Sequence, residues 1–321
     1  MRALVRTGSS KNLTLDTAHP KPTSDDFPND YIIQVKATAL TRGELTWPEP
    51  LESDVPIPGY DLAGAVVAVP RTPGPKAYQV GDEVYGLTNP YKQGNARAFA
   101  AVDERELALK PKNLNWEEAA AVPLSALSAY QGLFVHGKLD APGEGANGGK
   151  RVLVTAASGG VGIWAVQLAH EAGVNVVGTC GPSNVDFVKS LGADTVLDYT
   201  KTDLLSWINE GPENRNFDVV LDCIGGKTLT ASWKCARNDG KIVSVAEPAD
   251  AKKPSHGVAE GVQGVWFIVE ANRGQLEQIT NWIEQGKCRS QVDQAFELED
   301  REEAFERLEG GHARGKIVLR I

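Results

Sequence analysis

The chain has 321 residues, of which 41% are hydrophobic and 23% are charged, with 33 glycines and 18 prolines. This composition is typical of a globular protein with a packed core, and the length favours two domains. The net charge of −9 argues against nucleic acid or an anionic membrane surface as a partner, because both bind positive protein surfaces. The sequence lacks an apolar run of about 18 residues and a CxxC pair, which argues against a membrane span and a cysteine metal cluster. We therefore expect a cytoplasmic protein.

The first ~110 residues have the pattern of a β-rich domain. Proline-rich stretches break any helical pattern between the β segments and indicate surface loops. The expected strands lie at residues 3–7, 31–40, 64–69 and 98–102, and the expected loops at 20–28, 48–58 and 70–75.

After residue 115 the pattern changes to helical composition over 115–136, followed by a glycine-rich linker over 141–149. Beyond the linker, strands and helices alternate, which indicates right-handed βαβ units and a doubly wound parallel sheet. The expected strands are 151–157, 175–180, 195–199, 217–225 and 241–246, with helices at 160–172, 183–191 and 202–210. The C-terminal part offers helical segments at 274–287 and 299–309 and a closing strand at 316–321.

A glycine-rich turn follows the strand that begins at residue 151. Glycine there lets a ligand approach the backbone, and the N–H groups of the following helix stabilise a pyrophosphate. The alternative is an ordinary tight turn, but the flanking strand, helix and second strand favour dinucleotide binding. The residues of this turn are Ser158, Gly159, Gly160, Val161 and Gly162.

The second strand of this unit ends without the carboxylate that binds the adenosine ribose in NAD-preferring enzymes. Thr179, Ser183 and Asn184 stand in that region instead, and they do not repel a 2′-phosphate. We therefore expect NADPH as the cofactor, although Ser183 is equally suited to cap the next helix. Asp222, at the end of a later strand, is positioned either to contact a ribose or to cap a turn.

Seven segments, in order along nearly the whole chain, carry a family resemblance. They are IPGYDLAGAVVAV (57–69), VGDEVYGL (80–87), PLSALSAYQGL (123–133), AASGGVG (156–162), VKSLGADTVLDY (188–199), FDVVLDCIGG (217–226) and ARGKIVL (313–319). The chain resembles the zinc-independent quinone oxidoreductase and enoyl reductase branch of the medium-chain dehydrogenases/reductases. The resemblance implies an α/β fold with a GroES-like β-rich substrate domain over 1–123 and 267–321. It also implies a Rossmann NADP(H)-binding domain over 124–266 and an active site in the cleft.

The resemblance also implies further cofactor contacts. Ser128 stands where the family usually has threonine, and Tyr199 resembles the tyrosine that packs beside the 2′-phosphate. Ser183 matches a phosphate-binding serine, but the basic residue that often follows it is absent. The remaining implied contacts are Phe267, Ile268 and Val269 beside the nicotinamide, and Arg314 and Lys316 near the cofactor.

Zinc-dependent relatives hold their catalytic metal through an early cysteine, the His-Glu pair of a PGHE motif and a later cysteine. Here the PGHE position reads Pro58-Gly59-Tyr60-Asp61, and the early region reads Thr41-Arg42-Gly43-Glu44. Zinc prefers thiolate and imidazole ligands, so we expect no metal. Without a metal, conjugate hydride addition is easier than carbonyl reduction, because an enolate spreads the developing charge.

We therefore expect an NADPH-dependent oxidoreductase that transfers a hydride to an activated C=C bond of a small unsaturated carbonyl or quinone-like substrate. Candidates for the proton donor are Tyr60, Glu44 and Tyr91. Two alternatives stay open, namely a carbonyl reductase or alcohol dehydrogenase, and a cofactor-binding protein with a non-redox role. Both a monomer and a homodimer are compatible with the sequence.

Overall fold

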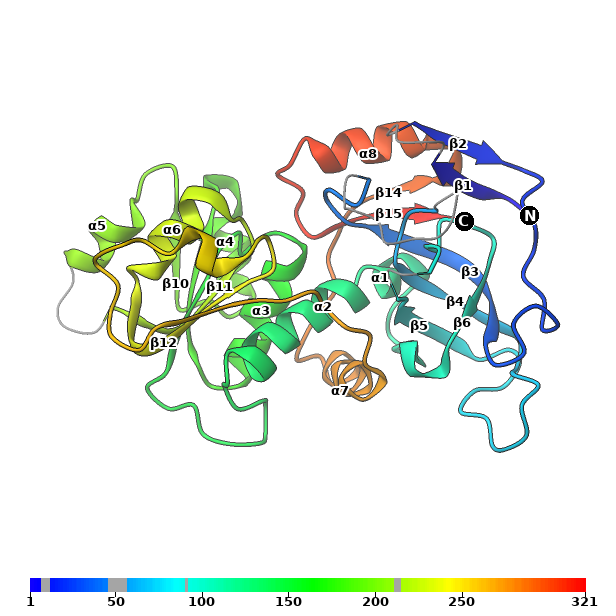
Figure 1. Cartoon of the computed structure of the whole chain (residues 1–321), viewed down its shortest axis with the longest axis horizontal. Coiled ribbons are helices and arrows are strands. Elements are labelled where there is room, and N and C mark those ends of the chain that lie inside the picture. The colour runs from blue at the N-terminus through cyan, green and yellow to red at the C-terminus, as the bar shows by residue number, and fades with distance from the viewer. Residues whose placement is uncertain (7–11, 46–56, 90–91, 211–214) are drawn as a thin grey trace. The chain divides into compact units, whose positions relative to one another are not determined.

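The computed structural model describes residues 1–6, 12–45, 57–89, 92–210 and 215–321. These residues form two compact units, one made of residues 1–127 and 270–321 and the other of residues 128–269. In Figure 1 the blue-to-cyan and orange-to-red segments belong to the first unit, and the green-to-yellow segments to the second. No helix within the described residues is both long enough and apolar enough to span a membrane.

The first unit is built on a seven-stranded sheet in which only the pair β14 and β15 is parallel. Along the sheet the order is β14 (Val292–Glu297), β15 (Lys316–Arg320), β3 (Tyr31–Leu40), β4 (Asp61–Ala68), β5 (Glu83–Leu87) and β7 (Leu107–Leu109), with β6 (Phe99–Val102) paired to β3. A separate antiparallel pair joins β1 (Ala3–Arg6) to β2 (Leu13–Asp16). The closing strand therefore pairs with a strand from the start of the chain, and this pairing makes the two sequence segments one domain.

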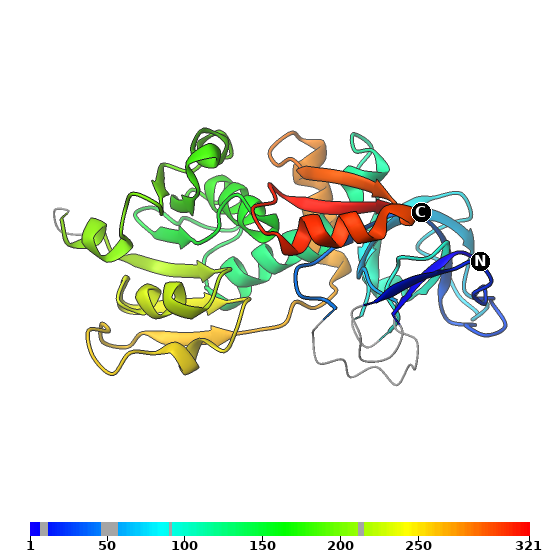
Figure 2. The ribbon, with the colours of Figure 1, turned by 90° about the horizontal axis from the view of Figure 1, so that it is seen from above.

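Among the described residues, three α-helices belong wholly to the first unit: α1 (Trp116–Ala120), α7 (Arg273–Glu284) and α8 (Arg301–Glu309). The last of these packs on β14 and β15 (Figures 1 and 2). Helix α1 ends just before Pro123, where α2 (Pro123–Tyr130) begins, because proline has no N–H to continue the helix. A π-helical turn, η2 (Gln131–His136), extends α2 into the second unit.

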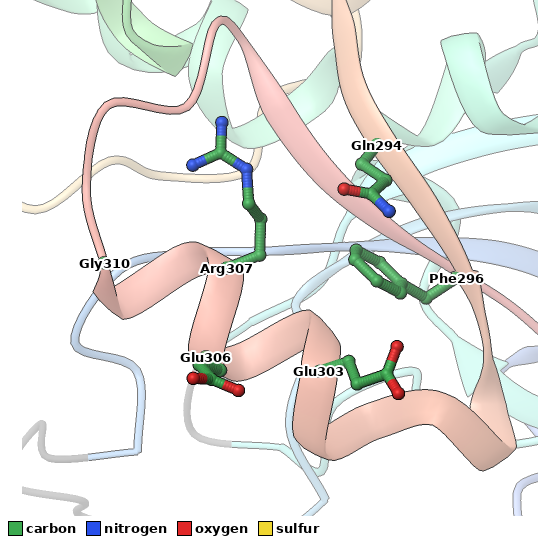
Figure 3. A pocket seen from close by; sticks show the side chains of 6 residues that line it. All are labelled: Gln294, Phe296, Glu303, Glu306, Arg307 and Gly310. Atoms are coloured by element: carbon green, nitrogen blue, oxygen red, sulfur yellow. The ribbon is translucent and has the colours of Figure 1, made fainter.

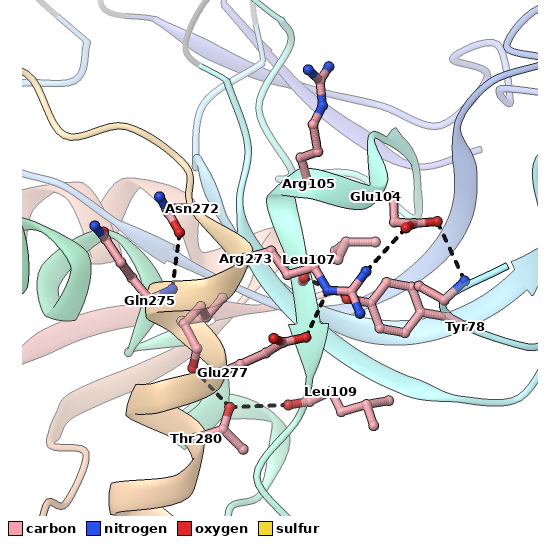
Figure 4. Close-up of polar contacts among 12 residues, drawn as sticks. Tyr78, Glu104, Arg105, Leu107, Leu109, Asn272, Arg273, Gln275, Glu277 and Thr280 are labelled. Carbon is pink, nitrogen blue, oxygen red and sulfur yellow. Dashed lines mark hydrogen bonds and ion pairs between the residues drawn. The ribbon is translucent and has the colours of Figure 1, made fainter.

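Helix α7 is fixed to the first unit by its N-terminal turn. Arg273 donates from Nε to Glu277 at 2.7 Å and from Nη1 to Glu104 at 3.1 Å, and its guanidinium lies 5.2 Å from the ring centre of Tyr78 (Figure 4). The side chain of Asn272 caps the helix by accepting the N–H of Gln275. Buried side chains then recur at helical spacing along one face, at Leu276, Ile279, Trp282 and Ile283.

The second unit is a six-stranded, all-parallel sheet. Its order is β10 (Thr195–Asp198), β9 (Asn175–Cys180), β8 (Arg151–Val154), β11 (Phe217–Asp222), β12 (Ala236–Ser244) and β13 (Gln263–Trp266). Its helices are α3 (Gly160–Glu171), α4 (Val185–Ser190), α5 (Leu204–Asn209) and α6 (Gly226–Trp233). With β8 as the first strand, the order is that of the doubly wound dinucleotide fold, and it reverses between β8 and β11.

The fold class expected from the sequence is confirmed. Strands β1, β3, β4 and β6, strands β8 to β12 and helices α3 to α5 overlap the predicted segments, whereas helix α6 was not predicted. The short strands β2, β5 and β7 have no matching prediction, because period-two alternation is a weak signal over three to five residues. Strand β14 was missed as well, since its sequence VDQAFE leaves most side chains partly exposed.

Candidate functional site

The glycine-rich turn lies between β8 and α3, beside the point where the strand order reverses. Gly159 is the N-cap of α3, and because glycine has no side chain, no side-chain cap occupies the first N–H groups of the helix. The first N–H groups of an α-helix have no partner within the helix, so they remain directed toward a ligand at this end. A Cβ on Gly162 would lie 2.2 Å from the carbonyl oxygen of Ala156, so only glycine permits this close packing. The turn therefore suits a pyrophosphate, as expected from the sequence.

The carboxyl end of β9 brings together the residues expected to contact the adenosine side. Thr179 is buried, and its carbonyl accepts the N–H of Ala157 from the glycine turn at 2.8 Å. Ser183 and Asn184 lie in the short 3₁₀ helix Pro182–Asn184 that follows. Tyr199 is 54% exposed, and its hydroxyl would lie 3.6 Å from a Cβ on Gly181. The separate segments carrying Tyr199 and Thr179 thus meet at this edge of the sheet.

Asp222 joins three strand ends at the switch point. Its Oδ1 accepts from the Thr155 hydroxyl at 3.0 Å, and its Oδ2 accepts from the N–H of Gly225 at 2.8 Å and from Ser244 Oγ at 3.4 Å. The residue is fully buried, and burial raises the pKa of its carboxyl although these hydrogen bonds oppose the rise. These hydrogen bonds give Asp222 a turn-capping role, and because a carboxylate can accept further donors, its contact with a ribose stays a prediction.

The residues expected beside the nicotinamide occupy two segments of the second unit. Ser128 is buried in α2. Phe267 is buried with its ring centre 4.3 Å from that of His136, whereas Ile268 is 61% exposed. A Cβ on Gly132 would meet the side chains of Leu221 and Phe267, so the segment after β13 packs closely on η2. Val269 is the last residue of this unit.

The first unit contains a buried ionic cluster at the positions that carry zinc ligands in zinc-dependent relatives. Lys316 Nζ lies 3.3 Å from Asp61 Oδ2 and 3.0 Å from Thr41 Oγ1. Glu44 accepts the N–H of Thr41 through Oε1 at 3.2 Å and the N–H of Gly59 through Oε2 at 3.1 Å. Lys316, Asp61 and Glu44 are each at most 5% exposed. The sequence alone indicates none of these long-range contacts.

Burial has the largest influence on the pKa of both carboxyl groups in this cluster. It raises the pKa of Glu44 from 4.5 to about 7, while the two N–H donors and Lys316 act in the opposite direction. It also raises the pKa of Asp61, against the attraction of Lys316 and the N–H of Leu124. With a pKa of about 7, Glu44 can hold a proton near neutral pH.

Tyr60 directly precedes Asp61 in the chain and is 4% exposed. Its carbonyl oxygen accepts the N–H of Thr88 at 2.9 Å and the side-chain amide of Asn95 at 3.1 Å. The preceding residue, Gly59, has φ +81°, a conformation that favours glycine. The backbone at Tyr60 is therefore fixed by the hydrogen bonds to its carbonyl oxygen and by the conformation of Gly59 before it. Tyr91, the third candidate donor, lies outside the described residues.

The two C-terminal residues expected near the cofactor lie in the first unit. Arg314 donates its backbone N–H to Asp293 Oδ1 at 2.8 Å. Lys316 is the first residue of β15, and its ammonium lies in the buried cluster described above. The contact with Asp61 is a role for Lys316 that sequence reasoning missed.

A zinc ion does not fit the residues present. The cluster offers two carboxylates and a hydroxyl, with no thiolate or imidazole among the named positions, and a lysine already pairs with one of the carboxylates. Zinc sites use deprotonated sulfur and nitrogen ligands in a tetrahedral array. Within the described residues, no three His, Cys, Asp or Glu side chains gather as metal ligands.

A shallow groove between β14 and α8 does not resemble the ionic cluster or the glycine-rich turn in its residues. Figure 3 shows the six residues that line it, namely Gln294, Phe296, Glu303, Glu306, Arg307 and Gly310. Arg307 is already paired with Asp293 at 2.9 Å. Two candidate sites therefore remain, each described within its own unit. One is the glycine-rich turn with the carboxyl end of β9 in the second unit, called here the dinucleotide edge, and the other is the ionic cluster of the first unit.

Comparisons with known proteins agree with this geometry. Residues 191–319 match a family model described as zinc-binding dehydrogenase. The chain is 41% identical to a probable zinc-binding oxidoreductase, mitochondrial, of Arthroderma benhamiae, over 99% of this chain and 98% of that protein. It is 36% identical to an NADPH-dependent alkenal/one oxidoreductase, chloroplastic, of Arabidopsis thaliana, over 82% of this chain and 63% of that protein.

Among solved structures, a quinone oxidoreductase from Coxiella burnetii superimposes with a TM-score of 0.81 at 26% identity, covering 100% of this chain and 99% of that one. The chain belongs to the medium-chain dehydrogenase/reductase superfamily. Within the superfamily it is a quinone oxidoreductase-like member, as its motifs indicate. It is an oxidoreductase with a nicotinamide cofactor.

Replacing Glu44 with glutamine is expected to reduce the pH dependence of thermal stability. The folded-state pKa of about 7 lies above the unfolded value of 4.5, so the neutral carboxyl stabilises the fold. That contribution is complete below about pH 4.5 and is lost as pH rises through about 7. Melting temperatures measured at about pH 5 and pH 8 should therefore differ less in Glu44→Gln than in the wild type.

The amide of Glu44→Gln cannot accept both N–H groups, so its melting temperature should also be lower at both pH values. Glu83, whose side chain is 54% exposed, provides the control, because Glu83→Gln should keep the wild-type difference. If the Glu44→Gln difference equals that of the wild type, the titrating group lies elsewhere.

Proposed function

We propose that this chain is a zinc-independent, NADPH-dependent oxidoreductase that delivers a hydride to an activated C=C bond of an enone, enoyl or quinone-like substrate. The observation that carries the proposal is a complete dinucleotide edge in one unit, together with an ionic cluster of lysine and carboxylates at the zinc-ligand positions of the other. The alkenal/one oxidoreductase and the quinone oxidoreductase to which this chain is similar are named for the same substrate class.

The preference for NADPH rests on the end of β9. That strand and the turn after it carry Thr179, Ser183 and Asn184, with no carboxylate to repel a 2′-phosphate. The half-exposed ring of Tyr199 beside Gly181 adds a flat surface at this edge. Ser183 is exposed and its hydroxyl suits a phosphate oxygen.

The bound cofactor supplies a hydride, and the protein has to position the substrate and provide a proton. We assign proton donation to Tyr60, whose backbone is held by Thr88 and Asn95. Glu44 holds a proton near neutral pH and accepts the N–H of Gly59, directly before Tyr60. Hydride addition at the β-carbon and proton transfer to the α-carbon or the oxygen then complete the reduction.

Transfer of deuterium from labelled cofactor tests this proposal. With NADPH deuterated at the transferring position, we expect the label at the β-carbon of an α,β-unsaturated ketone, detected by NMR or mass spectrometry. Titration of both cofactors should give at least tenfold tighter binding of NADPH than of NADH, or ~1.4 kcal/mol. Equal affinities would contradict the cofactor assignment.

The position of the label also separates the alternatives. Deuterium on a carbinol carbon would identify a carbonyl reductase. Cofactor binding without transfer to any enone, quinone or aldehyde in a panel would identify a non-redox role. In both cases the C=C reduction proposed here is wrong.

We further propose a cytoplasmic location and a monomer or homodimer. The two relatives described above are named as mitochondrial and chloroplastic proteins, so an organelle is the competing location. Cell fractionation decides between the two, and light scattering of the purified protein gives the oligomeric state.

A further inference from the structure

The ionic cluster of the first unit reaches an element that also carries a cofactor residue. Asp61 accepts the N–H of Leu124 through Oδ1 at 2.6 Å, while its Oδ2 faces the Lys316 ammonium. Leu124 is the second residue of α2, so the carboxylate lies at the N-terminus of this helix. A negative charge there stabilises a helix through its dipole and its unpaired N–H groups. Asp61 therefore fixes the start of α2.

The same helix carries Ser128, one turn after Leu124. A helix is stiff over this distance, so the position of its first turn determines the position of Ser128. Lys316 in turn favours the charged form of Asp61, because it supplies a cation within 4 Å of this fully buried carboxyl group. Lys316 and Asp61 are thus connected to Leu124, and helix α2 runs on from Leu124 to Ser128.

Lys316 also binds the segment that precedes Glu44. Its ammonium contacts Thr41 Oγ1 at 3.0 Å, and the N–H of Thr41 is bonded to Glu44, which in turn accepts the N–H of Gly59. One cation therefore joins the two segments, Thr41–Glu44 and Pro58–Asp61, that carry metal ligands in zinc-dependent relatives. The matched family is described as zinc-binding, yet these residues do not suit zinc. The Lys316 ammonium supplies a positive charge at this place in the fold instead.

We propose that the Lys316 ammonium, rather than a metal ion, is the fixed cation of this site, and that through Asp61 it positions α2 and Ser128 for cofactor binding. Lys316 is a positioning residue in this proposal. The second part rests on the proposed nicotinamide-cofactor function, whereas the first part does not.

The test compares Lys316→Met, Asp61→Asn, the double variant and Lys316→Arg, with Lys110→Met as the matched control. Lys110 is equally buried in the same unit, where it contacts Glu83 at 3.1 Å and the carbonyl of Leu114 at 2.6 Å. It has no contact with Asp61. The measurements are the melting temperature without cofactor, the dissociation constant of NADPH and the metal content of the wild type.

We expect Lys316→Met to lower the melting temperature by about 5–10 °C, because it leaves a buried carboxylate without its counterion. Its dissociation constant for NADPH should rise about tenfold, equivalent to ~1.4 kcal/mol. The double variant should recover part of both losses, since asparagine still accepts the Leu124 N–H without an unpaired charge. Lys316→Arg should keep part of the affinity, and Lys110→Met should lose stability while keeping the wild-type dissociation constant.

Three results would overturn the proposal. Wild-type protein holding about one zinc per chain would refute the role of the ammonium. An unchanged NADPH dissociation constant in Lys316→Met, or the same increase in Lys110→Met, would refute the positioning of α2. If Lys316→Met does not fold, the double variant should fold, and its failure to do so would refute the pairing of the ammonium with Asp61. Failure of the wild type to bind NADPH would instead contradict the proposed function.

Discussion

Replacing Gly162 with alanine is expected to weaken NADPH binding by about 100-fold and to destabilise the second unit by ~1–3 kcal/mol. The added Cβ would lie 2.2 Å from the carbonyl oxygen of Ala156 and 2.7 Å from the Cα of Ala157. Both neighbours are backbone atoms, so no side chain can rotate away. The start of α3 must shift by ~1 Å to reach normal contact distances, and its N–H groups then no longer converge on the pyrophosphate.

The dissociation constant of NADPH, measured by fluorescence titration, checks this prediction. Gly148→Ala in the same unit is the control, because a Cβ there meets no atom within 4 Å. Its affinity and stability should equal those of the wild type. Binding of NADPH by Gly162→Ala within about twofold of the wild type would mean that the glycine turn does not hold the pyrophosphate.

The second unit could be predicted from its sequence because its signals are local. Apolar runs, a glycine turn and helices of 6 to 12 residues follow one another, so each βαβ step is read within about 30 residues. The strand order then follows from the doubly wound pattern. In the first unit, by contrast, β15 pairs with β3 across nearly 280 positions, and only the family resemblance joined the two ends of the chain.

The glycine turn of the candidate site was also predictable, whereas the ionic cluster was not. Glu44 and Tyr60 were found by their position in motifs, but burial decides what Glu44 can do, and burial depends on segments far apart in the chain. The pairing of Lys316 with Asp61 joins residues 255 positions apart and leaves no periodic signal. Asp222 illustrates the same point, because two of its three protein donors, Thr155 and Ser244, lie at the ends of other strands.

Replacing Tyr60 with phenylalanine is expected to lower turnover by about 100-fold while leaving the NADPH dissociation constant unchanged, as for loss of a positioned general acid. The substitution removes only the hydroxyl. The backbone should stay in place, because the hydrogen bonds to the Tyr60 carbonyl come from Thr88 and Asn95 and do not involve the ring. Steady-state rates with an enone substrate, combined with a cofactor titration, measure the two quantities.

Tyr85→Phe is the matched control for the loss of a buried phenol. Tyr85 is fully buried in β5, and its hydroxyl lies 2.8 Å from Thr280 Oγ1 on α7, so its removal should cost about 1 kcal/mol of stability without changing turnover. A solvent isotope effect on turnover should be present in the wild type if proton transfer from Tyr60 limits the rate. If Tyr60→Phe retains wild-type turnover, water donates the proton and the tyrosine only shapes the pocket. If both variants lose turnover equally, the loss reflects weakened packing of the first unit and Tyr60 is not the donor.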